Sequence, residues 1–296
     1  MQVALAQPDP DVSKPKVEVR IRLPSPDLQA FVTFYYFVEA FESLTDFLYP
    51  EWGNVRLSLR GDWMILNDPR DPHVGANRTL FGPTDRRGKI ITQGGATAGF
   101  GLTPLGWDRL IGGSAGAMAN RVREIEGELG VHAAALQAAF IEDAGDDAAG
   151  SARFDTLLFD LLKIRPLNDP LVLETDRVLR ERPPDSASFA EAVGVSPRTL
   201  HRICLRAFGF PPKRLLRRQR FLGTLGLMRV SPDSRFGALI GDAYFDQAHF
   251  NRDFRDFMGM TARDYANTPR ALMKAAAAAQ VANDITLSFE LPKAPI

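Results

Sequence analysis

Two segments in the C-terminal third of the chain gather side chains that form hydrogen bonds with nucleobases. Residues 196–206 contain three arginines and a histidine, and residues 247–252 contain glutamine, asparagine and arginine. Arginine and histidine can reach the acceptors of guanine in the major groove, and asparagine and glutamine suit adenine. The repeated occurrence of these side-chain types indicates a surface that binds nucleic acid.

The residues around the first segment predict two helices joined by a tight turn. Ser188 is expected to cap a short helix, and Gly194 suits the left-handed backbone of a turn. Ser196 at the N-cap and Pro197 at the first helical position begin the next helix. One face of that helix is apolar and is formed by Leu200, Ile203, Cys204 and Phe208. A helix, a turn with glycine and a helix with a polar outer face form a helix-turn-helix unit.

A second copy of this pattern follows 50 residues later. The shift brings three residues onto similar ones, because Leu200, Arg202 and Gly209 become Phe250, Arg252 and Gly259. The second unit is expected from Arg235 to Phe257, with a turn one residue longer and with Asp246 as the cap. Between the copies, Pro212–Met228 reads as a long basic helix that ties both units into one rigid body. Two such units can enter successive major grooves, roughly 34 Å apart.

Residues 166–270 resemble the DNA-binding domain of the AraC family of bacterial regulators. The run Ala190-Glu-Ala-Val-Gly-Val-Ser-Pro-Arg-Thr-Leu-His-Arg looks like the first unit of that family. The run Tyr244-Phe-Asp-Gln-Ala-His-Phe-Asn-Arg-Asp-Phe-Arg, followed by Gly259 and Tyr265, looks like the second. Ala243 and Ala262 depart from the Gly and Pro that the family usually has there. The resemblance implies base-reading side chains at Arg198, Thr199, His201, Arg202, Gln247, Ala248, Asn251 and Arg252.

Other residues of the helical part are expected to bind DNA phosphates, which positions a protein without reading sequence. These are Ser196, Arg206, Arg214, Arg217 and Arg218. The alternative is that the arginines of the basic helix are merely exposed to solvent. The position of this helix between two helix-turn-helix units favours contact with DNA. His249 is expected to pack or cap within the second unit.

The charge is divided unequally along the 296 residues, although the net charge is zero. Arg165–Ala275 holds 19 Lys and Arg against 12 Asp and Glu, so the other residues are acidic overall. This asymmetry indicates that only the basic part meets a polyanion. We predict a disordered N-terminus (1–16), a β-rich sensor or dimerisation domain (17–142), a linker and connecting helix (143–165), a double helix-turn-helix domain (166–272) and a C-terminal tail (273–296).

The N-terminal half shows the pattern of short strands separated by turns that is typical of a β-rich domain. Apolar and polar residues alternate at 17–23 and 55–59, and Gly and Pro separate further short segments. Helical patterns are predicted near 115–127 and 131–141. The fold class is therefore α+β, with a β-rich, barrel-like N-terminal domain followed by an all-α double helix-turn-helix domain.

This half also resembles, in Leu48-Tyr-Pro-Glu-Trp-Gly and Gly99-Phe-Gly-Leu-Thr-Pro-Leu-Gly-Trp, the cupin-like sensor domains found ahead of AraC-type domains. That resemblance implies effector binding, dimerisation or both. Aromatic side chains can line an apolar ligand pocket, and Trp52, Trp63, Phe100 and Trp107 are the candidates. The alternative is that they belong to the core.

The sequence offers little support for catalysis or for a bound metal. No Ser-His-Asp, Cys-His or paired-carboxylate arrangement stands out, and His201 and His249 lie on separate units without ligand partners. We expect no metal, no cofactor and no enzymatic activity. Cys204 is the single cysteine, and its apolar surroundings favour a buried thiol over a redox sensor. Without a signal peptide or an apolar membrane span, the protein is expected to be cytoplasmic.

The function predicted from these features is a sequence-specific transcription regulator. Its partners would be double-stranded DNA, an effector, RNA polymerase and a second copy of the chain, with no membrane. Two alternatives stay open: an enzyme domain that the helical domain targets to DNA, and a nonspecific architectural DNA-binding protein.

Overall fold

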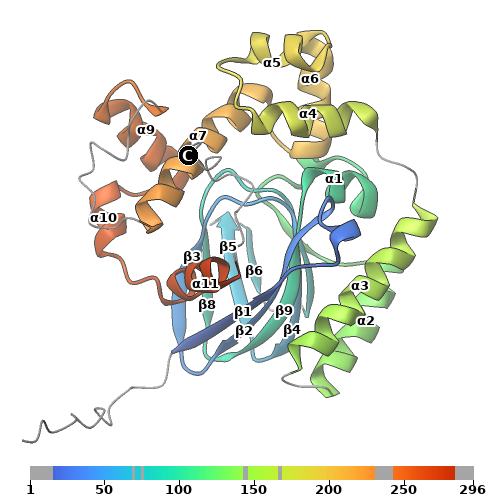
Figure 1. Cartoon of the computed structure of the whole chain (residues 1–296). Helices are drawn as coiled ribbons and strands as arrows, with labels where there is room; N and C mark the ends of the chain where they lie inside the picture. The colour runs from blue at the N-terminus through green and yellow to red at the C-terminus, as the bar shows by residue number, and fades with distance from the viewer. Residues whose placement is uncertain are drawn as a thin grey trace, which may run out of the picture.

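The structure, a computed structural model, describes residues 16–68, 71–74, 77–142, 146–165, 169–230 and 243–283. Two antiparallel sheets form the N-terminal part, and the helices that follow lie mainly above one end of the sheets (Figure 1). The predicted α+β class, with a β-rich part followed by a helical part, is confirmed.

The larger sheet has six strands in the order β1-β2-β9-β4-β7-β10. They are β1 (Val17–Arg22), β2 (Val32–Ala40), β4 (Asn54–Arg60), β7 (Arg78–Phe81), β9 (Gly95–Leu102) and β10 (Val122–Glu124). Successive side chains of a strand point to opposite faces. In β2, Tyr35 and Phe37 join one apolar cluster, and Tyr36 and Val38 join another. Both faces of this sheet are therefore covered.

The smaller sheet has the order β3-β8-β5-β6, with β3 (Leu44–Leu48), β5 (Trp63–Asp68), β6 (Asp71–Val74) and β8 (Gly88–Thr92). Trp63, Ile65 and Ile90 of this sheet share a cluster with Ile21 and Tyr36 of the larger one. Within the described residues the two sheets do not close into a single barrel. The barrel-like domain is thus an open pair of packed sheets.

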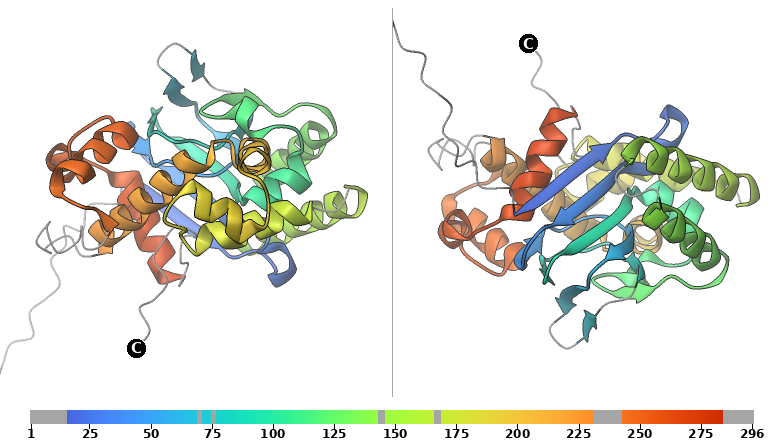
Figure 2. Two further views of the ribbon diagram at one scale, coloured as in Figure 1. Left: turned by 90° about the horizontal axis from the view of Figure 1, so that it is seen from above. Right: turned by 90° about the horizontal axis from the view of Figure 1, so that it is seen from below.

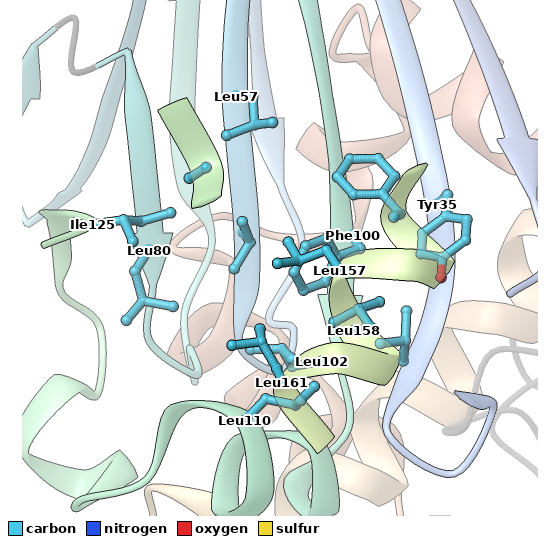
Figure 3. Close-up of a cluster of buried hydrophobic side chains, with 14 of the residues drawn as sticks. Tyr35, Leu57, Leu80, Phe100, Leu102, Leu110, Ile125, Leu157, Leu158 and Leu161 are labelled. Atoms are coloured by element: carbon cyan, nitrogen blue, oxygen red, sulfur yellow. The ribbon is translucent and has the colours of Figure 1, made fainter. Parts of the chain in front are cut away.

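Two helices, α2 (Gly127–Glu142) and α3 (Asp147–Ile164), cover the other face of the larger sheet (Figure 2). Figure 3 shows Leu157 and Leu161 of α3 among the side chains of the strands, near Phe100. The hydroxyl of Tyr35 donates to Oδ1 of Asp155 at 2.6 Å and fixes α3 on β2. The described part of the predicted linker therefore contributes to the core of the sheet domain.

Four short helical segments connect these layers: η1 (Pro26–Leu28), α1 (Pro104–Gly106), the π-helical η2 (Trp107–Ile111) and η3 (Ala115–Met118). The predicted helix over 115–127 is wrong, because η3 ends after four residues. Asn120 follows with a left-handed φ of 59°, which a helix does not accept, and β10 then pairs with β7.

The remaining helices are α4 (Pro170–Arg180), α5 (Ser186–Val193), α6 (Pro197–Ile203), the π-helical η4 (Cys204–Phe208), α7 (Pro212–Val230), α9 (Gln247–Met258), α10 (Ala262–Asn267) and α11 (Ala271–Ala282). The predicted long basic helix is α7, and it runs between the group α4–α6 and the group α9–α10 (Figure 1). The segment predicted as a tail begins inside α11, which packs on β1 and β3. There, Oδ2 of the buried Asp46 accepts from the backbone nitrogen of Leu272 at 2.8 Å.

Candidate nucleic-acid interface

The first unit consists of α5, a glycine turn and α6, as the sequence predicts. Gly194 has a φ of 76°, and Ser196 accepts a hydrogen bond from the backbone nitrogen of Thr199 at 3.2 Å. The expected cap at Ser188 is wrong: the carboxylate of Asp185 accepts from the first-turn nitrogens of α5 and fills that role. The N-cap and the left-handed glycine together fix how α6 leaves the turn.

The inner face of α6 and η4 holds the unit together. Leu200, Ile203, Cys204 and Phe208 are buried, as predicted from their spacing. Burial raises the pKa of the Cys204 thiol to about 12. A thiol with so little thiolate at neutral pH is a poor nucleophile, which agrees with a structural role.

The outer face of α6 lines a hollow of about 640 Å³. Five of the residues predicted to contact DNA surround it, namely Arg198, Thr199, His201, Arg202 and Arg206. The other lining residues are Leu205 and, from the sheet domain, Ser114. Leu205 was missed because it looks like a core residue. Ser114 was missed because it lies about 90 residues away in the sequence.

The basic side chains on this face differ in how they are held. Arg198, His201 and Arg202 are exposed, and no hydrogen bond or ion pair holds them within the described part of the chain. Arg206 is half-buried and donates to Oδ2 of Asp169 at 2.7 Å. The outer face of α6 therefore presents two arginines and a histidine without carboxylate partners, which suits it to an anionic ligand.

The second unit is described from Ala243 onward, and its expected first helix lies outside the described residues. Asp246 caps α9, as predicted, by accepting from the backbone nitrogen of His249 at 2.6 Å. The ring of His249 lies against Tyr244, with 5.1 Å between the centroids, so this histidine packs within the unit. The predicted readers Gln247, Ala248 and Arg252 are exposed, and Asn251 is half-buried.

The 50-residue repeat is visible in the backbone. Gly209 after η4 and Gly259 after α9 both have left-handed φ values, 86° and 61°. Ala262 stands where the family usually has Pro, and α10 still begins there, because Thr261 and Asp264 form a capping box. This departure therefore leaves the local structure intact.

Two arginines of α7 that were predicted to bind phosphate are instead bound to carboxylates. Nε of Arg214 donates to Oδ2 of Asp85 at 2.7 Å, and its Nη1 bonds to Asp256. Nη2 of Arg217 donates to Asp253 at 2.7 Å and to Asp256 at 2.8 Å. Their donors tie α7 to the sheet domain and to α9, so their positions do not support phosphate binding.

The structure speaks more clearly against the predicted phosphate contact of Arg218, because the side chain of Arg218 is only 2% exposed. Its guanidinium lies 4.1 Å from the ring centroid of Trp52, and its Nε donates to the carbonyl of Thr84 at 3.0 Å. Burial lowers its pKa to about 9, although the charges of Asp85 and Glu51 oppose that effect. A residue enclosed in this way does not reach a DNA backbone.

The four aromatic residues expected around an effector pocket are not brought together. Trp63 lies between the sheets, whereas Phe100 and Trp107 lie in the cluster beneath α3. Trp52 packs against Phe208 of the first unit, with 6.0 Å between the ring centroids. Their positions fit the alternative of core residues, and Trp52 belongs to the contact between the domains.

The described part of the chain holds neither a cluster of metal ligands nor a membrane-spanning helix. No group of three or more His, Cys, Asp or Glu residues there is placed to hold a metal ion. No helix among those residues is both long and apolar enough to span a bilayer.

A family model matches the helical part of the chain, and several solved structures are similar to it at low identity. The family model described as a helix-turn-helix domain matches residues 189–268. Among solved structures, ToxT from Vibrio cholerae O395 is similar, with 11% identity, 85% of this chain and 97% of that chain covered, and a TM-score of 0.44. The AraC-like transcriptional activator CuxR has 16% identity, coverage of 70% and 86%, and a TM-score of 0.31. No curated protein sequence matches.

A helix-turn-helix unit and a repeat-related capped helix, joined by one connecting helix, are elements of a DNA-binding domain. Because the identities and TM-scores of the solved structures are low, the assignment rests on the match over residues 189–268 and on their own geometry. These residues form a helix-turn-helix domain of the AraC type, as the sequence motifs predicted.

Proposed function

We propose that this protein is a sequence-specific transcription regulator that reads DNA with α6 and α9. The observation that carries the proposal is the hollow along α6, lined by four basic side chains. Three of these, Arg198, His201 and Arg202, are exposed and have no carboxylate partner among the described residues. Such a face suits the acceptors and phosphates of a DNA groove.

The proposed contacts follow the prediction with one revision. Arg198, Thr199, His201 and Arg202 read bases in one groove, and Gln247, Ala248, Asn251 and Arg252 read bases in the next. Ser196 and Arg206 bind phosphate beside the first groove. Arg206 stays on the list although Asp169 binds it, because its side chain is 42% exposed and lines the hollow. Arg214, Arg217 and Arg218 leave the list, because carboxylates, a carbonyl or Trp52 hold them.

The sheet domain is proposed to bind an effector, to dimerise or to do both. Support comes from its direct packing on both units: Trp52 contacts the first, and Phe47 and Tyr49 share a cluster with the second. A change in the sheet domain therefore has a physical route to either recognition helix. RNA polymerase and a second copy of the chain are the further partners of this proposal.

Genome-wide mapping of bound sites, followed by footprinting with the purified full chain, tests the function. We expect a limited set of sites that share a sequence, and occupancy that responds to at least one candidate effector. Uniform coverage of all DNA would contradict sequence-specific reading and favour an architectural protein. Turnover of a bound small molecule would favour an enzyme domain that is targeted to DNA.

A further inference from the structure

The loop between β7 and β8 touches all three parts of the DNA-binding domain in succession. Pro83 meets the end of the first unit, Thr84 and Asp85 meet the connecting helix α7, and Arg87 meets the second unit. The first unit ends just before α7, and α9 of the second unit packs along the N-terminal half of α7, where Asp256 binds Arg214. One loop beneath this half of α7 can therefore reach both units.

The contact with the first unit is made at the glycine that ends η4. Gly209 has a φ of 86°, and a Cβ placed on it would lie 2.4 Å from Cγ of Pro83. The close approach and the left-handed backbone both require glycine here. The end of η4 is therefore seated directly against the loop.

The contact with the connecting helix is polar and buried. The carbonyl of Thr84 accepts from Nε of Arg218 at 3.0 Å. Oδ2 of Asp85 accepts from Nε of Arg214 at 2.7 Å, and the carbonyl of Asp85 accepts from Nη2 of the same side chain at 3.1 Å. Asp85 is only 8% exposed, so this ion pair is shielded from solvent and holds its geometry.

The contact with the second unit is made at the repeat-related glycine. The backbone nitrogen of Arg87 donates to the carbonyl of Phe257 at 2.9 Å, in the last turn of α9. The side chain of Arg87 lies 3.5 Å from the Cβ position of Gly259 and reaches Sδ of Met260 at 3.9 Å. Both repeat-related glycines, Gly209 and Gly259, thus lie against residues 83–87 of the same loop.

Hydrogen bonds to other parts of the sheet domain fix the loop in place. Nδ2 of Asn120 donates to Oδ1 of Asp85 at 2.9 Å, and its Oδ1 accepts from the backbone nitrogen of Asp85 at 3.1 Å. The backbone nitrogen of Thr84 donates to the carbonyl of Glu51 at 2.8 Å. These bonds join the loop to two other segments of the sheet domain, so it acts as part of a rigid body.

We propose that residues 83–87 form a splint that fixes the two recognition helices relative to each other and so sets the spacing of the DNA half-sites. Asp85 is the main positioning residue, because its side chain binds both Arg214 of α7 and Asn120 of the sheet domain. The inference rests on the proposed function, since half-site spacing has meaning only if both helices read DNA. On this view the sheet domain helps to select the DNA sites and does more than respond to a signal.

The test measures the affinity of the full chain for a mapped site and for versions with one to three base pairs added or removed between the half-sites. Wild type should prefer one spacing by at least about tenfold, because the two helices are held at a fixed separation. Asp85→Ala should reduce that preference to about twofold or less, a change of about fivefold that lies at the lower end of the usual range of coupling between sites. Binding to an isolated first half-site should not change.

The control is Glu39→Ala, which removes a carboxylate paired with Arg60 at 2.5 Å in the same domain and away from the loop. Asn120→Ala serves as a second variant, because it removes the support of the loop but keeps Asp85 and Arg214. If Asp85→Ala and Asn120→Ala both keep the wild-type spacing preference, the splint is refuted. An equal loss of affinity at every spacing also refutes it. Failure of wild type to bind any site with sequence preference refutes the proposed function instead.

Discussion

The two helix-turn-helix units share a backbone pattern but use charge in different ways. In the first, the outer face of α6 leaves Arg198, His201 and Arg202 exposed. In the second, α9 carries two aspartates whose carboxylates bind arginines of α7. The repeat preserves the apolar positions and the terminal glycines, whereas the electrostatic role of the second helix has changed.

The difference is sharpest at two repeat-related positions. Ile203 of the first unit corresponds to Asp253 of the second, and both side chains are buried. Arg206 corresponds to Asp256, so the charge is inverted at the same place. The first helix is held to its unit by apolar contacts and is free to offer cations to DNA. In the second helix, the carboxylates of Asp253 and Asp256 form ion pairs with arginines of α7. Their negative charge makes this helix less attractive to a polyanion.

Asp253→Ala should have the largest effect on stability. Asp253 is 1% exposed and accepts from Arg217 at 2.7 Å and from Arg220 at 3.1 Å. Removal of one partner from a buried ionic cluster leaves the other charges uncompensated, and we expect a loss of about 2–4 kcal/mol in the free energy of unfolding. Urea unfolding of the full chain measures it. The matched control is Asp256→Ala, whose more exposed side chain should cost less; an equal cost would contradict the special role of Asp253.

Arg202→Ala and the repeat-related Arg252→Ala separate the two units in DNA binding. Loss of Arg202 should weaken binding to a mapped site by ~1–3 kcal/mol and flatten base preference near one half of it. Loss of Arg252 should cost less, because aspartates crowd its helix. Titrations against a panel of single-base variants measure both. Arg22→Ala, an exposed arginine of β1, is the control. Equal losses on all sequences would exclude base reading by Arg202.

Glu51→Gln should change how stability depends on pH. Burial raises the pKa of Glu51 to about 7 from 4.5, although Arg56 and Arg218 oppose the shift. A carboxyl with a raised folded-state pKa stabilises the fold below the unfolded pKa, and this contribution is lost as pH rises through the folded value.

We therefore expect wild type to lose about 1–2 kcal/mol relative to Glu51→Gln between pH 5 and pH 8. Urea unfolding at both pH values measures the difference. A parallel pH dependence of the two proteins would show that Glu51 does not titrate in this range.

The sequence predicted the elements of the first unit well because local rules determine them. Gly194, Ser196 and Pro197 act on their immediate neighbours, and the apolar spacing of α6 follows from the helical period. The predicted helix over 115–127 failed because long-range contacts decide that segment: β10 pairs with β7, a strand about 45 residues earlier in the chain. The same reason hid Ser114 at the hollow and Asp85 beneath α7.

The arginines of α7 show why residue type alone misassigned a role. Their density predicted a phosphate-binding face, but partners from distant segments determine where each guanidinium points. Asp85 and Asp256 bind Arg214, and Trp52 covers Arg218. Because a guanidinium serves equally well in an ion pair, in an aromatic stack or at a phosphate, its surroundings decide its function.

The smallest expected effect concerns the salt dependence of DNA binding, and it tests the removal of Arg218 from the predicted phosphate contacts. Each phosphate contact that is lost lowers the slope of log Kobs against log salt by about 0.9. Arg218→Met keeps an aliphatic side chain over Trp52 and removes a charge that does not reach DNA, so the slope should stay at its wild-type value. Arg206→Ala, at the edge of the hollow, should lower it by up to about 0.9. Filter binding over a series of salt concentrations measures both slopes. If Arg218→Met lowers the slope as much as Arg206→Ala does, then α7 turns on binding to present its arginines. In that case the contrast between a cation-presenting first helix and a carboxylate-tied second helix would hold for the free protein alone.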